Sequence, residues 1–109
     1  MAITPELRQR IEETLNSQRV VLFMKGTRDF PMCGFSARTV ALLQDAGADF
    51  RDVNILEDEE LRQGLKEYSD WPTYPQLYVD GKLLGGCDIV SEMHETGELE
   101  KLVTGAAKA

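Results

Sequence analysis

Cysteine is scarce in this chain of 109 residues, which has only Cys33 and Cys87. Two cysteines are too few for the disulfide framework of a small secreted domain, so reduced thiols are expected. Long apolar runs are also missing, because the longest, VVLFM at residues 20–24, is far shorter than the about 20 residues that cross a bilayer. The first residues, MAITPELRQR, include no apolar signal-peptide core. We therefore expect no membrane association and a cytoplasmic protein, or one in the matching compartment of an organelle after processing.

Basic charge is the minority charge, with 12 Lys and Arg against 19 Asp and Glu and a net charge of -7. This balance argues against non-specific binding to nucleic acid or to anionic lipid. Basic residues nevertheless outnumber acids between positions 19 and 38, where Asp29 is the one acid among Arg19, Lys25, Arg28 and Arg38. Such a neighbourhood would attract a small anion, although scattered surface charge is the simpler interpretation of charge alone.

The composition is otherwise that of an ordinary soluble domain, with 42% apolar and 28% charged residues. A chain of this length is expected to form a single domain over residues 1–109, with a frayed tail from about residue 104.

Apolar spacing and turn residues predict the element order α, β, α, β, α, β, β, α. Phe35, Val40 and Leu43 have helical spacing, and Asp80-Gly81 between two apolar runs predicts a hairpin. The predicted elements are a helix from Thr4-Pro5, a strand at 20–24, a helix at 34–46, a strand at 50–55, a helix around 61–68, strands at 76–79 and 82–85, and a last helix capped by Asp88 and kinked at Gly97. The first strand, helix and strand would form a right-handed parallel unit, so we expect an α/β fold with a mixed four-stranded sheet covered by helices.

Cys33 lies in the sequence FPMCGFS, between a loop and a predicted helix. Unpaired backbone N–H groups and the positive end of the helix dipole favour its thiolate, and Lys25 would add to the effect. The alternative, an inert buried cysteine, fits poorly with the Gly, Pro and polar neighbours. Ser36 stands where a C-x-x-C redox motif has its second cysteine, and a serine hydroxyl cannot resolve a mixed disulfide.

Two further motifs stand near the ends of predicted elements: Thr73-Tyr74-Pro75 before the hairpin and Gly85-Gly86-Cys87-Asp88 at the last helix. Trans is the common form of such a bond, but only a cis Tyr74-Pro75 bond would turn the Tyr74 backbone toward Cys33 as an edge for an extended peptide, so we predict cis. With CGFS, the preceding KGTRDFP and the following WPTYPQLYV, these motifs resemble the glutaredoxin branch of the thioredoxin fold, specifically the monothiol, CGFS-type glutaredoxins. The resemblance covers all but the last few residues.

The resemblance implies a glutathione site. The residues it assigns are Lys25 beside the catalytic sulfur of Cys33, Arg62 for the glycine-end carboxylate, the backbone of Tyr74 for the cysteine portion, and Cys87 and Asp88 for the glutamyl group. Without the resemblance, Lys25 and Arg62 would be interpreted as solvated surface charges. The family more often has a branched aliphatic residue or Phe at position 74; the backbone role of Tyr74 is expected to be kept, and the effect of its phenol on the choice of partner stays open.

The resemblance also implies that Cys33 and the thiol of glutathione ligate a [2Fe–2S] cluster. Because such a cluster takes four ligands, two chains and two glutathiones would be needed, giving a homodimer with the cluster and a monomer without it. BolA-like proteins and apo iron–sulfur clients are the implied partners, while His94 is interpreted as a surface residue. Two alternatives remain: a glutathione-dependent thiol–disulfide oxidoreductase, and a redox module using a Cys33–Cys87 disulfide.

Overall fold

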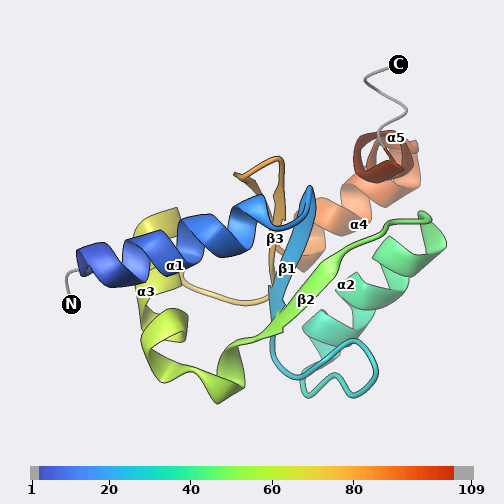
Figure 1. The fold of residues 1–109 in the computed structure, drawn as a ribbon. Coiled ribbons are helices and arrows are strands. Elements are labelled where there is room, and N and C mark those ends of the chain that lie inside the picture. Colours follow the sequence, from blue (N-terminus) through green and yellow to red (C-terminus); the bar gives the residue numbers. More distant parts are fainter. Residues whose placement is uncertain (1–2, 105–109) are drawn as a thin grey trace.

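A single mixed sheet organises the chain in the computed structural model, which describes residues 3–104 (Figure 1). The elements are α1 (Pro5–Asn16), β1 (Val20–Met24), α2 (Gly34–Asp45), β2 (Arg51–Asn54), the short 3-10 helix η1 (Ile55–Glu57), α3 (Glu59–Ser69), β3 (Gln76–Val79), β4 (Lys82–Gly85), α4 (Cys87–Thr96) and α5 (Glu98–Thr104). The strand order is β2-β1-β3-β4, with β1 parallel to β2 and antiparallel to β3, and β3 antiparallel to β4. This is the predicted α/β arrangement of the thioredoxin fold.

Helices cover both faces of the sheet, and β1 supplies apolar side chains to both. Val20, Leu22 and Met24 pack with residues of α2, α4 and α5, whereas Val21 and Phe23 pack with residues of α1 and α3. All five side chains are buried, as expected for a central strand that alternates between two cores. Because β1 packs against apolar side chains on both faces of the sheet, its carboxyl end has a fixed position, and the loop that leads to Cys33 starts there.

Several predicted ends of elements are confirmed. The Thr4 hydroxyl caps α1 by accepting a hydrogen bond from the Leu7 backbone N–H at 3.1 Å. Asp80 and Gly81 both have positive φ angles, 53° and 79°, as a two-residue hairpin turn requires.

The close packing of α3 on α1 depends on Gly64, since a Cβ there would lie 2.4 Å from the Leu7 side chain.

The C-terminal third differs from the prediction in three places. Gly86, not Asp88, is the N-cap of α4, so Asp88 lies inside the first turn. Gly97 adopts a φ of 83° and ends α4, so the predicted kink is a complete break before α5. Thr104 is still helical, and the remainder of the predicted tail lies outside the described residues. Within residues 3–104, no helix has the length and apolar character needed to cross a membrane.

Candidate functional site

Cys33 is the N-cap of α2 and follows the loop that leaves β1. Its thiol is free and partly exposed. The pKa of Cys33 is lowered chiefly by a hydrogen bond from the Ser36 backbone N–H, against an opposing effect of burial. The Phe35 backbone N–H, the Lys25 charge and the Ser36 hydroxyl lower it further. The helix start therefore favours the thiolate of Cys33, the direction that the sequence predicted.

Ser36, the residue in place of a second cysteine, is completely buried. Its hydroxyl oxygen accepts a hydrogen bond from the Lys25 backbone N–H at 3.1 Å, which ties the end of β1 to the first turn of α2. Ser36 therefore stabilises the thiolate, mainly through its backbone N–H, and its side chain joins Lys25 to the helix that follows Cys33.

Ser36→Ala should lower the free energy of unfolding by about 1–3 kcal/mol, because the Lys25 N–H loses its buried acceptor. The pKa of Cys33 should rise, but only in part, since the Ser36 backbone N–H remains. Urea denaturation and the pH profile of Cys33 alkylation measure the two effects. Ser17→Ala, at the exposed end of α1, is the control, and equal stability losses in both variants would contradict the role of Ser36.

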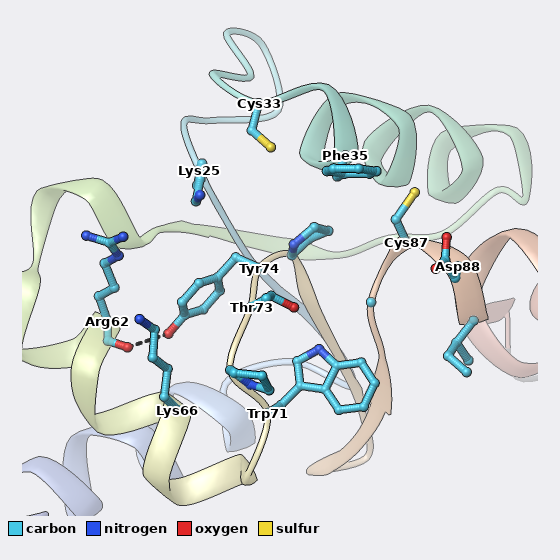
Figure 2. A pocket seen from close by; sticks show the side chains of 14 residues that line it. Lys25, Cys33, Phe35, Arg62, Lys66, Trp71, Thr73, Tyr74, Cys87 and Asp88 are labelled. Carbon is cyan, nitrogen blue, oxygen red and sulfur yellow. Dashed lines mark hydrogen bonds between the residues drawn. The ribbon is translucent and has the colours of Figure 1, made fainter.

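A cavity of about 620 Å³ opens beside Cys33 (Figure 2). All six site residues that the sequence predicted line it: Lys25, Cys33, Arg62, Tyr74, Cys87 and Asp88. They come from the end of β1, the starts of α2 and α4, the middle of α3 and the loop before β3. Residues far apart in the sequence thus form one pocket, with cations toward α3 and a carboxylate at the start of α4.

The pocket also includes residues that the sequence analysis did not assign to it: Lys66, Trp71, Thr73 and Phe35. Lys66 follows Arg62 by one helical turn, and this spacing could have indicated a second cation on the same face. The helical spacing of Phe35 with Val40 and Leu43 is compatible with core packing or with protein contact. Phe35 is 64% exposed and lies over the pocket, which excludes core packing (Figure 2).

The phenol of Tyr74 is buried and hydrogen-bonded to α3. The hydroxyl donates a hydrogen bond to the Arg62 backbone carbonyl at 2.7 Å, and burial raises the pKa of Tyr74 far above its ordinary value. Tyr74 is 7% exposed, so its phenol offers little surface to an approaching partner. The Tyr74–Pro75 bond is cis, which confirms the prediction from the sequence.

Two buried nitrogen atoms at the pocket have no partner among the described residues, Arg62 Nε and Trp71 Nε1. The Arg62 guanidinium has one ion pair, to Glu59 at 3.4 Å, on the exposed side of α3. A guanidinium with spare donors, one turn from Lys66, suits the carboxylate of a small ligand. On the other side, Gly86 allows close approach of backbone, since a Cβ there would lie 3.1 Å from the Pro75 carbonyl oxygen.

Cys87 is also a free thiol in the pocket, but it is only 8% exposed. His94 lies outside the pocket lining and contacts Asp45 at 2.6 Å, joining α4 to α2 at the surface, as its surface assignment predicted. In the described part of the chain, no three His, Cys, Asp or Glu side chains come together as a metal site.

A single thiol activated at a helix start, next to a cis-proline loop on a four-stranded mixed sheet, defines a thiol protein of the thioredoxin fold. Comparisons with known proteins are more specific, because residues 20–84 match the model of the glutaredoxin family. The chain belongs to this family, and within it to the monothiol glutaredoxins.

Three relatives illustrate the similarity. The chloroplastic monothiol glutaredoxin-S14 of Arabidopsis thaliana is 60% identical over 105 residues, which are 96% of this chain but 61% of the plant protein. The solution structure of reduced poplar apo GrxS14 is 55% identical, with full coverage of both chains and a TM-score of 0.83. A buckwheat glutaredoxin–glutathione complex is 26% identical, covering 96% of this chain and 97% of the other, with a TM-score of 0.79. Since the Arabidopsis relative is named chloroplastic, a cytoplasmic location stays a prediction.

Proposed function

We propose that this protein binds glutathione in the pocket beside Cys33 and carries a [2Fe–2S] cluster as cargo between two copies of the chain. The main support for the proposal is the contrast between Cys33 and Ser36, the first and last residues of the CGFS motif. Cys33 is a partly exposed thiol with a lowered pKa, whereas Ser36 is buried and engaged with Lys25. A protein so equipped can hold a metal through one thiolate but lacks the second motif thiol that would resolve a mixed disulfide.

The charges of the pocket support glutathione as the ligand. Glutathione has a carboxylate at each end, an amino group beside one of them and a thiol in the middle. Lys25, Arg62 and Lys66 offer cations for the glycine end, and the first turn of α4 offers backbone N–H groups, with the Asp88 carboxylate for the amino group. Between them, the Tyr74 backbone would pair with the cysteine portion and bring its sulfur toward Cys33. The buckwheat complex, from a related protein, supports the same ligand class.

Ligand count supports a shared cluster. A [2Fe–2S] cluster takes four ligands, usually sulfur, and residues 3–104 contain no ready-made group of metal ligands. Cys33 supplies one thiolate, glutathione supplies a second, and the 8% exposed Cys87 is a poor further ligand. Two chains and two glutathiones reach four, which makes the cluster-bound form a homodimer and the cluster-free form a monomer. BolA-like proteins and apo iron–sulfur proteins are the partners that we propose for such a carrier.

The surface around Cys33 supports contact with a second chain. The large apolar side chains exposed among the described residues are Phe30 at 78%, Met32 at 71%, Phe35 at 64% and Leu56 at 45%. The first three lie within three residues of Cys33. Apolar side chains beside a cargo-binding thiol are what a small interface between two copies would bury.

Phe30→Ser should weaken the cluster-bound dimer about tenfold, because a small interface loses the burial of one large apolar side chain. Glutathione binding should not change, since Phe30 does not line the pocket. Sedimentation of the coloured protein over a concentration series measures the dimer, and titration calorimetry measures the ligand. A dimer of unchanged strength would place the interface elsewhere.

Anaerobic reconstitution with iron, sulfide and glutathione, followed by an absorption spectrum, tests the function. The protein should become coloured with glutathione and stay colourless without it. A protein that stays colourless in both conditions would refute cluster carriage.

A second function, thiol–disulfide exchange with glutathione, is favoured by the lowered pKa of Cys33. The Cys33 thiolate would attack the glutathione sulfur of a mixed disulfide and release the other thiol. A second glutathione thiolate would then attack the Cys33-bound sulfur, which regenerates Cys33 and forms oxidised glutathione. Turnover of a glutathionylated peptide by a colourless protein would favour this activity over carriage.

A further inference from the structure

The loop from Lys25 to Met32 is held from outside by a strand that contributes nothing to the pocket. The Arg28 backbone N–H donates to the Asp52 carboxylate at 2.9 Å, and Arg28 Nε donates to it at 3.1 Å. The Arg28 guanidinium also donates to the Phe50 carbonyl and lies over the Phe50 ring, 4.0 Å from the ring centroid. One arginine thus fixes the middle of the loop to β2 and to the residue before it.

A second attachment lies at the start of the loop. The Asn54 side-chain oxygen accepts hydrogen bonds from the Gly26 N–H at 2.9 Å and the Leu56 N–H at 3.0 Å. Asp52 and Asn54 are two positions apart on β2, so their side chains point to the same side, and both bond to this loop. The ion pair is partly shielded, with side-chain exposures of 33% for Arg28 and 22% for Asp52. Burial alone would raise the pKa of Asp52, but the hydrogen bonds and charge of Arg28 lower it overall, so the carboxylate is ionised at neutral pH.

Because the loop is attached to β2, the position of Cys33 at its end is restrained as well. It folds back on itself, with the Met32 N–H donating to the Lys25 carbonyl at 2.9 Å. The return is tight, since a Cβ on Gly26 would lie 2.4 Å from the Phe30 carbonyl oxygen and 2.7 Å from the Met32 nitrogen. The residue before Cys33 is therefore hydrogen-bonded to Lys25, which lines the same pocket as Cys33. If the loop moved, the distance from Lys25 to the Cys33 sulfur would change with it.

We propose that Asp52, acting through Arg28, is a positioning residue for the Cys33 thiol: it fixes the loop that sets Cys33 relative to Lys25. The proposal rests on the role of Cys33 as the reactive thiol and does not need the cluster. Neither Asp52 nor Arg28 lines the pocket, so neither is expected to contact glutathione. The charged residues that do line the pocket, Lys25, Arg62, Lys66 and Asp88, are not substituted in the variants below.

The test is the pH profile of Cys33 alkylation by iodoacetamide in a Cys87→Ser background. In Asp52→Ala and Arg28→Ala, the midpoint should move to higher pH and the rate at pH 7 should fall about threefold, because Cys33 loses part of a solvent-screened attraction to Lys25. The double variant should lose less than the sum of the two single losses, since both variants break the same ion pair, while the Arg28 backbone N–H bond to Asp52 and the Arg28 contacts with Phe50 are each lost in only one of them. Asp52→Asn keeps one acceptor oxygen for Arg28 and should lie between wild type and Asp52→Ala.

Arg19→Ala is the matched control. Arg19 pairs with Asp80 at 2.9 Å and donates to the Leu102 carbonyl at 3.0 Å, so it loses the same kinds of bond next to the amino end of β1. It should lose comparable stability in urea and keep the wild-type profile. A wild-type profile in Asp52→Ala and Arg28→Ala, or additive losses in the double variant, would overturn the positioning role. An ordinary thiol profile in the wild type would instead overturn the proposed role of Cys33 itself.

Discussion

Cys33→Ser should abolish cluster binding and thiol chemistry. Cys33 is the thiol that lies at the helix start and is accessible from the pocket, and an alcohol at that position stays protonated at neutral pH. Serine is close to cysteine in size, so the fold should be retained. The absorption spectrum after anaerobic reconstitution measures cluster binding, and circular dichroism checks the fold.

Cys87→Ser is the matched variant and should keep most of the cluster. The Cys87 sulfur is nearly buried, and only the backbone of this residue is proposed to contact glutathione. If Cys87→Ser lost the cluster as completely as Cys33→Ser, the assignment of Cys33 as the single protein ligand would be wrong.

Lys25→Ala and Arg62→Ala should each weaken glutathione binding by about 1–3 kcal/mol, the usual cost of losing a charge-assisted hydrogen bond to a carboxylate. Both side chains line the pocket, and Arg62 has a buried Nε without a partner in the described structure. Fold stability should change little, because neither side chain belongs to the two apolar cores. Titration calorimetry with reduced glutathione measures the affinity.

Lys101→Ala is the control. Lys101 is exposed on α5 and does not line the pocket, so the variant removes the same charge and should bind glutathione as the wild type does. Wild-type affinity in both Lys25→Ala and Arg62→Ala would remove these residues as carboxylate ligands. Equal weakening in all three variants would show that overall charge, and not a specific contact, attracts the ligand.

Local patterns in the sequence predicted most of the fold. Thr4-Pro5 marks the first helix, VVLFM the central strand and Asp80-Gly81 the hairpin, and each depends on interactions within a few residues. Local patterns do not predict how distant segments meet. Phe35 has helical spacing with two core residues, but only the folded structure shows that it is exposed and lies over the pocket (Figure 2).

The candidate site was predicted less directly, because a pocket is assembled from separate elements. The helix start at Cys33 could be inferred locally, but the grouping of Arg62 with Lys25 and Asp88 came from resemblance to a family. The Arg28–Asp52 pair joins residues 24 positions apart, and no periodicity in the sequence indicates it. The inward orientation of the Tyr74 phenol likewise depends on a carbonyl in α3 that only the packed structure places nearby.

Gel filtration of the reconstituted protein, with iron and glutathione analysis of the coloured fraction, tests whether two chains and two glutathiones share one cluster. We expect a coloured dimer with about one iron and one glutathione per chain, by the count of four ligands, and a colourless monomer once the cluster is removed. A coloured monomer, or a coloured dimer without glutathione, would contradict it.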